Sequence, residues 1–146
     1  MSSYVLPQRL LAALKSADTR IRVAKNAALD AAGLTHPQFT ALRVLSVDPG
    51  LTAAEIARRC EVTPQTMAAL LPRMEAAGLA ERHRNPRTGA VEVVPTADGR
   101  AKYAEALAQL DLVEASVAAA LSAAEADQLC DLLERCAQAA KAGRST

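Results

Sequence analysis

The stretch that decides the fold is VTPQTMAALLPRMEAAG, at residues 62–78. Its apolar side chains recur at the spacing of one helical face, and they are Met67, Leu70, Leu71 and Met74. Thr63 is of a residue type that caps helix N-termini, and a proline such as Pro64 is tolerated at the first helical position. Gly78 is of the type that ends many helices in a left-handed conformation. We therefore predict a helix that begins at Pro64 and ends just before Gly78.

A second proline, Pro72, falls inside this predicted helix. An internal proline removes one backbone hydrogen bond and clashes with the carbonyl four residues earlier, here that of Ala68. The cost is about 3 kcal/mol when the helix does not bend. We hypothesise that a kink near Ala68 re-aims the first turn, residues 63–67, while the apolar face stays packed. The alternative is that the proline is tolerated without consequence.

A shorter helix is expected directly before this one. Thr52 and Glu55 have the spacing of a capping box, in which each side chain bonds the other residue's backbone N–H. The apolar residues Ile56 and Ala57 follow, and residues 61–62 leave room only for a tight connection. Two helices joined by such a short turn form a helix-turn-helix. In that unit the second helix lies in the DNA major groove, with its N-terminal residues at the base edges.

After Gly78 the sequence pattern changes from one typical of helices to one typical of short strands. Residues 79–84 (LAERHR) and 90–94 (AVEVV) are predicted to be short strands around the polar link NPRTG. A hairpin of this kind lays basic side chains along phosphates or into the minor groove. Each element alone is weak evidence. Their order, helix, turn, helix and basic hairpin, favours a DNA-binding protein.

Long helices are expected on both sides of this region, over residues of about 6–32 and about 97–142. The composition agrees, because 51% of the residues are apolar and only 2% are aromatic. Alanine makes up roughly a quarter of the chain and is the strongest helix former. The length of 146 residues is that of one domain. We therefore predict a mainly α protein.

Charge and cysteine content set the remaining limits. The net charge of +1 neither requires nor excludes a nucleic-acid partner. Neither a signal peptide nor an apolar run of about 20 residues is evident, so we expect a cytoplasmic protein without a membrane partner.

The three cysteines form no CxxC pair. We interpret Cys60, Cys130 and Cys136 as small buried apolar side chains rather than redox sensors. We expect no metal and no cofactor, and the absence of any nucleophile–base pair or phosphate loop argues against an enzyme.

The segment LTAAEIARRCEVTPQTMAALLPRMEAAGLAER, at residues 51–82, resembles the MarR family of winged-helix transcriptional regulators. The parts that carry the resemblance are MEAAGL at 74–79, Arg82, and TADG at 96–99. The resemblance extends over nearly the whole chain. It implies one domain over residues 1–146, with a winged helix-turn-helix at about 35–95 and a two-stranded wing. The long helices at about 6–32 and 97–142 would then join two copies into a homodimer.

Function follows from the same resemblance. It implies a homodimer that binds a palindromic operator in duplex DNA and regulates transcription, as a repressor released by a small aromatic or phenolic effector. Departures from the family pattern leave an alternative open. Ala68 and Ala69 stand where the family often has polar residues, and the wing is about one residue shorter and has no aspartate. A helical dimer that no longer reads DNA sequence and acts through a protein partner would fit these departures.

The residues expected to contact DNA are Thr52, Thr63, Pro64, Gln65, Thr66, Arg73, Arg84 and Arg87. A glutamine pairs naturally with an adenine edge, so Gln65 is a candidate base reader. Arg73 is either a phosphate contact or a solvated side chain near Glu75. By resemblance, a ligand pocket would lie near Arg22, His36, Phe39, Arg43 and Tyr103. Phe39 and Tyr103 also fit as ordinary core residues.

Overall fold

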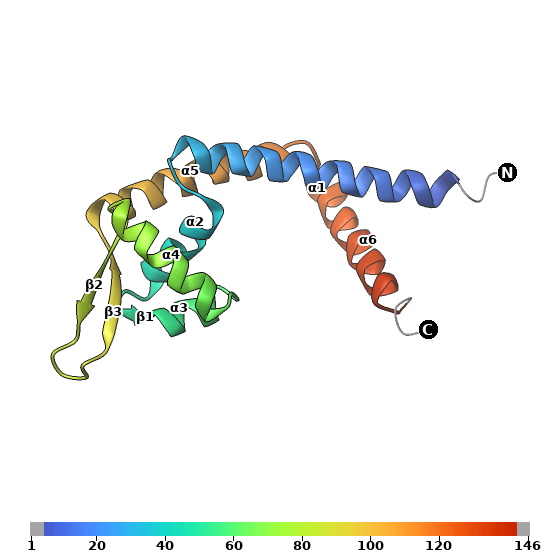
Figure 1. Cartoon of the computed structure of the whole chain (residues 1–146). Helices are drawn as coiled ribbons and strands as arrows, with labels where there is room; N and C mark the ends of the chain where they lie inside the picture. Colours follow the sequence, from blue (N-terminus) through green and yellow to red (C-terminus); the bar gives the residue numbers. More distant parts are fainter. Residues whose placement is uncertain (1–4, 143–146) are drawn as a thin grey trace. The chain divides into compact units, whose positions relative to one another are not determined.

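The structure is a computed structural model that describes residues 5–142 (Figure 1). Within that range the order of elements is α1 (Val5–Ala31), α2 (His36–Val47), β1 (Leu51–Thr52), α3 (Ala53–Arg59), α4 (Pro64–Ala76), β2 (Ala80–Arg84), β3 (Val91–Pro95), α5 (Ala97–Ala118) and α6 (Ala123–Ala142). The chain forms two compact units that meet between Leu110 and Asp111. The prediction of a mainly α fold with a basic hairpin is confirmed.

Helix starts follow the capping signals in the sequence. Three of the described helices begin with a capping box, in which the first residue's hydroxyl accepts a backbone N–H and the second residue's side chain accepts one in return. The pairs are Thr35 with Gln38, Thr52 with Glu55, and Ser122 with Glu125. Thr63 caps α4 in the predicted way, with Pro64 at the first helical position. These polar contacts satisfy N–H groups that a helix terminus leaves without partners.

The predicted hairpin is confirmed to within one residue, but it is part of a larger sheet. Strands β2 and β3 are antiparallel, with Arg82 opposite Val93 and Arg84 opposite Val91. The short strand β1 pairs with the other edge of β3 and gives the order β1-β3-β2. The two-stranded expectation omitted β1, because a two-residue strand has no side-chain alternation to detect. Through β1, the start of α3 is tied to the hairpin.

The core of the first unit is almost entirely aliphatic. Its most deeply buried large side chains are Leu34, Leu42, Leu45, Ile56, Met67, Leu71, Met74, Leu79 and Val93. Phe39 is also buried and its ring lies 5.2 Å from the ring of Tyr103, centroid to centroid. Val44 of α2 is only half-buried. The core therefore packs α2, α3, α4 and β3 around one another.

The second unit leaves its apolar side chains uncovered. No residue of α6 is buried. The large apolar residues that remain exposed in this unit are Leu112, Val117, Leu121, Leu129, Leu132 and Leu133. Cys130 is exposed as well, so its interpretation as a buried apolar side chain is wrong. Among residues 5–142 no single helix is long and apolar enough to cross a membrane, and α5 and α6 reach that limit only when counted together.

The end of α4 and the start of α5 meet in a close backbone contact. Gly78, in a left-handed conformation with φ 70°, ends α4. The backbone N–H of Thr96 donates to the carbonyl of Leu79 at 3.1 Å, and the Thr96 hydroxyl donates to the carbonyl of Gly78. That hydroxyl also accepts the N–H of Gly99 at 2.9 Å. A Cβ atom at position 99 would lie 2.0 Å from the Leu79 carbonyl oxygen, so only glycine fits there.

We expect Gly99→Ala to lower the free energy of unfolding by about 1–3 kcal/mol, because the added methyl group forces the two backbones apart. Urea unfolding monitored by circular dichroism measures the change. Ala101→Ser, an exposed substitution two residues along the same helix, is the control and should cost under about 0.5 kcal/mol. An unchanged urea midpoint in Gly99→Ala would show that the contact is looser than described.

Candidate nucleic-acid interface

The turn between α3 and α4 is closed by backbone hydrogen bonds. The N–H of Glu61 donates to the carbonyl of Arg58 at 3.2 Å, and the N–H of Val62 donates to that of Ala57 at 3.0 Å. These two bonds form the common helix-ending motif in which one residue is left-handed. That residue is Glu61, with φ 56°, where a glycine is usual. A left-handed conformation costs a non-glycine residue about 1–2 kcal/mol, and no residue type in this turn predicts it.

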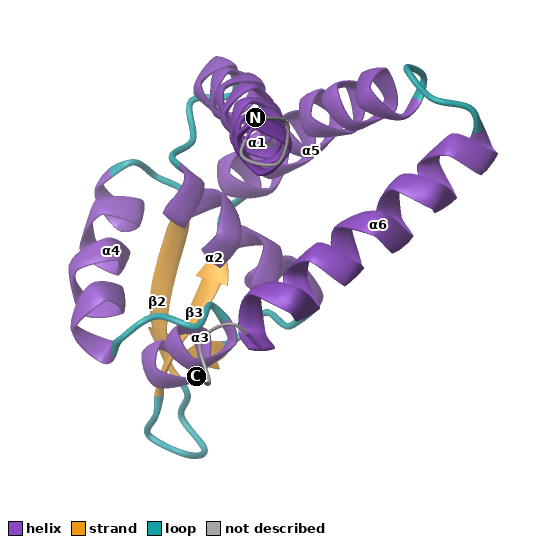
Figure 2. Cartoon of the chain, turned by 90° about the vertical axis from the view of Figure 1, so that its right-hand side faces the viewer, coloured by secondary structure: helices purple, strands orange, loops and turns teal. Residues whose placement is uncertain are grey.

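Helix α4 divides cleanly into a buried and an exposed side. Met67, Leu71 and Met74 are buried against the rest of the first unit. Gln65, at the N-terminal end, is exposed, and so are the outward residues Ala68, Ala69, Pro72 and Arg73. Figure 2 shows α4 along one flank of the sheet, beside β2. The outer side of α4 is therefore available to a ligand as large as a DNA duplex.

Pro72 lies in a helix that continues without interruption from Pro64 to Ala76. Pro72 and Ala68 are both exposed, so the Ala68 carbonyl, which receives no N–H from Pro72, is on the solvent side. A carbonyl that water can solvate costs much less than one left unpaired in a core. The exposure of both residues explains how α4 accommodates the proline. The re-aiming of the first turn by a kink stays a prediction.

The first turn of α4 leaves one polar side chain uncommitted. The Thr63 hydroxyl accepts the N–H of Thr66 at 3.1 Å and lies 2.8 Å from the Thr66 hydroxyl. Thr63 and Thr66 therefore bond one another as well as capping the helix. The Gln65 side chain is exposed and forms no hydrogen bond to any other residue that the structure describes. Its amide is the group in this turn with both a donor and an acceptor to offer to a base edge.

Thr52 occupies the corresponding position at the start of α3. Its backbone N–H and its hydroxyl each donate to a carboxylate oxygen of Glu55 at 2.8 Å. The backbone N–H of Thr52 is the main reason that the pKa of Glu55 is lowered, and the hydroxyl adds to the effect. Thr52 is thus committed to the capping box. A contact with a phosphate would have to be made in addition to these bonds.

The tip of the hairpin is organised by Asn85. Its Oδ1 accepts the backbone N–H of Arg87 at 2.9 Å, and its Nδ2 donates to Glu92 at 2.7 Å. Arg84 donates to the carbonyl of Gly89 at 3.0 Å, across the same tip. Arg84 and Arg87 are exposed, so the tip presents two guanidinium groups on a defined backbone. Sequence reasoning found both arginines but not the asparagine that orders the loop.

The arginines of this region fall into two groups. Arg59 forms an ion pair with Asp48, and Arg82 forms one with Glu75. Within residues 5–142, no ion pair involves the second group, which consists of Arg58, Arg73, Arg84 and Arg87. Glu75 is engaged by Arg82, so the expected alternative partner of Arg73 is already occupied. These four arginines therefore present exposed positive charge, and the exposed carboxylates of the same region are Glu61 in the turn and Glu81 on β2.

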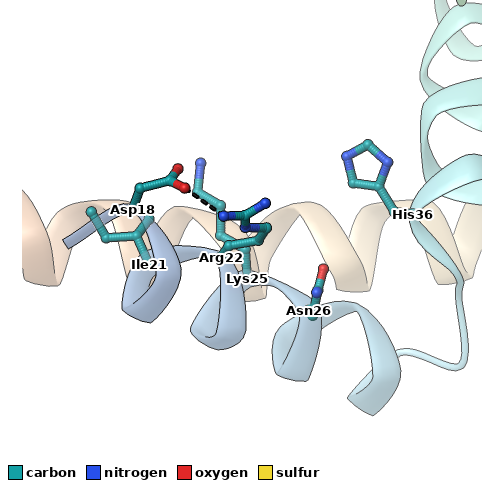
Figure 3. A pocket seen from close by; sticks show the side chains of 6 residues that line it. All are labelled: Asp18, Ile21, Arg22, Lys25, Asn26 and His36. Carbon is teal, nitrogen blue, oxygen red and sulfur yellow. Dashed lines mark hydrogen bonds and ion pairs between the residues drawn. The ribbon is translucent and has the colours of Figure 1, made fainter. Parts of the chain in front are cut away.

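The residues expected to line one ligand pocket do not lie together in the structure. Arg22 and His36 lie at a hollow of about 290 Å³ beside α1, together with Asp18, Ile21, Lys25 and Asn26. Figure 3 shows Arg22 bonded to Asp18 on α1, with His36 facing them from α2. Three of the six lining residues are basic, which suits an organic anion. Lys25 and Asn26 were not expected from the sequence, because only the packing of α1 and α2 brings them to this hollow.

Phe39, Tyr103 and Arg43 do not line that hollow. Phe39 and Tyr103 stack on each other in the core, which agrees with their alternative interpretation as core residues. Arg43 is exposed on α2. A second hollow, of about 160 Å³, lies between α2 and α4, and His36 lines it together with Cys60 and Met67 among others. Burial raises the pKa of the Cys60 thiol, which disfavours the reactive thiolate.

A short turn between two helices, an exposed outer side on the second helix and a basic hairpin define a winged helix-turn-helix protein. A family model described as the MarR family matches residues 32–90. The HTH-type transcriptional repressor Rv2887 of Mycobacterium tuberculosis is 39% identical over 116 residues, which are 79% of this chain and 84% of that protein. This chain belongs to the MarR family, and is accordingly a transcriptional regulator rather than an enzyme.

Solved structures agree with this assignment. The YusO protein of Bacillus subtilis superposes with a TM-score of 0.77 at 25% identity, covering 95% of this chain and 99% of that one. Rv2887 in complex with DNA superposes with a TM-score of 0.65 at 36% identity, covering 86% and 95%. Rv2887 in complex with p-aminosalicylic acid gives 0.62 at 36% identity, covering 88% and 98%.

We expect acid to weaken the capping box that starts α3. The pKa of Glu55 is lower in the folded chain than its unfolded value of about 4.3. The stabilisation is therefore complete at neutral pH, and is lost as the pH falls from about 4.3 through the lower folded pKa. Glu55→Gln keeps an acceptor oxygen but does not titrate. Its urea midpoint should fall less than that of the unaltered chain between about pH 5 and about pH 3. An equal fall of the urea midpoint in both proteins would show that the ionised Glu55 side chain does not stabilise the start of α3.

Proposed function

We propose that this chain is a homodimeric transcriptional repressor that binds a palindromic DNA operator and is released by a small aromatic acid. The observation that carries the proposal is the uncommitted Gln65 on α4, flanked by the unpaired arginines of α3, α4 and the hairpin. Rv2887, which is named a repressor and has been solved with DNA, supports it. Because the target is duplex DNA, we place the protein in the cytoplasm.

In the proposed complex, the N-terminal turn of α4 enters the major groove and Gln65 reads an adenine edge. Thr52, Thr63, Pro64 and Thr66 approach the backbone beside it, where helix N-termini favour phosphate oxygens. Arg73, Arg84 and Arg87 neutralise phosphates on either side of the groove. Affinity then comes mainly from released counterions, and selectivity comes mainly from Gln65.

The exposed leucines of α5 and α6 support the homodimer. Leu112 keeps 61% of its surface exposed, and Leu129 and Leu132 keep 44% each. A soluble chain rarely exposes so many large apolar side chains on one pair of helices unless a partner covers them. We propose one domain over residues 1–146, in which α1, α5 and α6 pair with their copies and residues 35–95 bind DNA. A dimer presents two copies of α4 to the two halves of a palindrome.

The hollow at Arg22, Lys25 and His36 supports an anionic effector. A guanidinium group binds a carboxylate through two parallel hydrogen bonds, and an aromatic acid could obtain this contact by displacing Asp18 from Arg22. The complex of Rv2887 with p-aminosalicylic acid makes the same ligand class plausible for this chain. Ile21 supplies an apolar wall for a ring.

We expect duplex DNA from just upstream of the protein's own gene to bind more tightly than a scrambled duplex of equal composition. Fluorescence anisotropy at several salt concentrations measures both affinities. Gln65→Ala should reduce the preference and leave the salt dependence unchanged, because an amide neutralises no phosphate. Arg84→Ala and Arg87→Ala should each reduce the slope of log K against log salt by about 1.8, because the dimer loses one phosphate contact in each subunit.

Arg9→Ala, an exposed change on α1 outside this interface, is the matched control and should leave both quantities unchanged. If both duplexes bind weakly and equally, the same comparison with duplexes selected from a random pool decides the question. Equal weak binding there as well would contradict a sequence-reading regulator. It would favour the alternative of a helical dimer that acts through a protein partner.

We expect salicylate to release the protein from the preferred duplex. Arg22→Gln should raise the salicylate concentration required by about tenfold or more, because a charge-assisted pair is worth about 1.5–3 kcal/mol. Its DNA affinity without salicylate should be unchanged, since Arg22 lies outside the proposed interface. Arg20→Gln, an exposed arginine on the same helix that does not line the hollow, is the control. If Arg22→Gln responds to salicylate as the unaltered chain does, the effector does not bind in this hollow.

A further inference from the structure

One arginine of the hairpin, Arg82, is committed to α4. Its Nε donates to Oε1 of Glu75 at 2.9 Å, and its Nη2 donates to the other carboxylate oxygen. Two parallel bonds of this kind fix the angle between the two groups as well as their distance. Glu75 lies in the last turn of α4, and Arg82 is the middle residue of β2. The pair therefore joins the helix to the hairpin.

Strand geometry explains why Arg82 and Arg84 make different contacts. Side chains alternate along a strand, so Ala80, Arg82 and Arg84 share one face of β2. Ala80 is buried, and Val93, directly opposite Arg82, is buried too, so this face turns toward the core. Arg82 stands where α4 is within reach. Arg84 is two residues farther out, and it bonds the hairpin tip instead.

The pair also changes the charge that each group offers to DNA. The hydrogen bond and the positive charge of Arg82 lower the pKa of Glu75, so the carboxylate is ionised at neutral pH. The two opposite charges cancel when seen from a distance. Arg82 consequently adds little to phosphate neutralisation, although it lies in a basic hairpin.

The hairpin is also held at its start, near the end of α4. The chain leaves α4 through Ala77, Gly78 and Leu79, and Leu79 is held to Thr96 by a backbone hydrogen bond. That bond fixes where the hairpin begins, and the pairing of β1 with β3 ties the hairpin to the start of α3. The bond between Glu75 and Arg82 joins β2 to α4 itself, farther along the strand, and so constrains the tilt between these two elements.

We propose that Arg82 is a positioning residue which, through Glu75, sets the tilt of the hairpin relative to α4. This inference rests on the proposed function, because the tilt decides whether Arg84, Arg87 and Gln65 meet the same duplex. In the competing interpretation, Arg82 leaves Glu75 on binding and contacts a phosphate itself. The two interpretations predict opposite effects of removing the Glu75 charge.

The test compares Glu75→Gln, Arg82→Gln and the double variant. The probes are a duplex selected from a random pool by the unaltered protein and a scrambled duplex of the same composition. We expect each single variant to bind the selected duplex about tenfold more weakly, and the double variant to be no weaker than either. Glu75→Gln raises the net charge and Arg82→Gln lowers it. A loss shared by both therefore cannot come from long-range attraction to DNA. The salt slope should not change in any of them.

Glu81→Gln is the matched control for Glu75→Gln. Glu81 lies on the same strand, is exposed and contacts His83 rather than α4, so the same change of charge should not weaken binding. Arg87→Gln is the comparison for a phosphate contact, with a salt slope reduced by about 1.8 because the dimer carries the substitution twice. Tighter or unchanged binding in Glu75→Gln would overturn the proposal. A slope lowered by about 1.8 in Arg82→Gln, which is one phosphate contact in each subunit, would do the same.

Amide hydrogen exchange in the protein without DNA separates this inference from the proposed function. Loss of the pair should speed exchange at residues 81–84 in Glu75→Gln and Arg82→Gln, but not in Glu81→Gln. If the unaltered protein prefers no duplex, the proposed function fails while the exchange rates still test the attachment. Exchange at 81–84 that is unchanged in both variants would exclude a positioning role for Arg82.

Discussion

The close approach of α5 to the end of α4 is the contact on which the first unit depends. Leu79 lies at the centre of it, with its side chain in the core and its carbonyl against Gly99 and the N–H of Thr96. Gly78 and Gly99 are required there for different reasons, one for a left-handed turn and the other for space. Because β2 starts at this point, the placement of the hairpin relative to α4 begins with the same few atoms.

Local signals predicted the helices well. Capping residues such as Thr52 with Glu55 act within four positions, so the sequence alone contains the whole interaction. Contacts between distant positions could not be read in this way. Strand β1 exists only because β3 offers it partners, and Glu61 is left-handed although its residue type does not favour it. The Glu75–Arg82 pair and the hollow at Arg22 likewise depend on tertiary packing.

The predicted DNA-contacting residues illustrate both cases. Gln65, Arg73, Arg84 and Arg87 are exposed as expected, while Thr52, Thr63 and Thr66 are also engaged in capping or in bonds with one another. The sequence shows that Arg82 matches the family pattern. Only the structure shows that its guanidinium group is bonded to Glu75 of α4. In the proposed complex the arginines have different roles: Arg73, Arg84 and Arg87 attract the duplex, and Arg82 holds the hairpin to α4.

The most direct test of the account is the sequence that the protein itself selects from a random pool of duplexes. A dimer that presents two copies of α4 should enrich an inverted repeat, with half-site centres about one helical turn, or 10 base pairs, apart. An adenine contacted by Gln65 should recur in each half-site. A pool that shows no enrichment, or a single site without a repeat, would contradict the proposal that a homodimer of this chain reads DNA through α4.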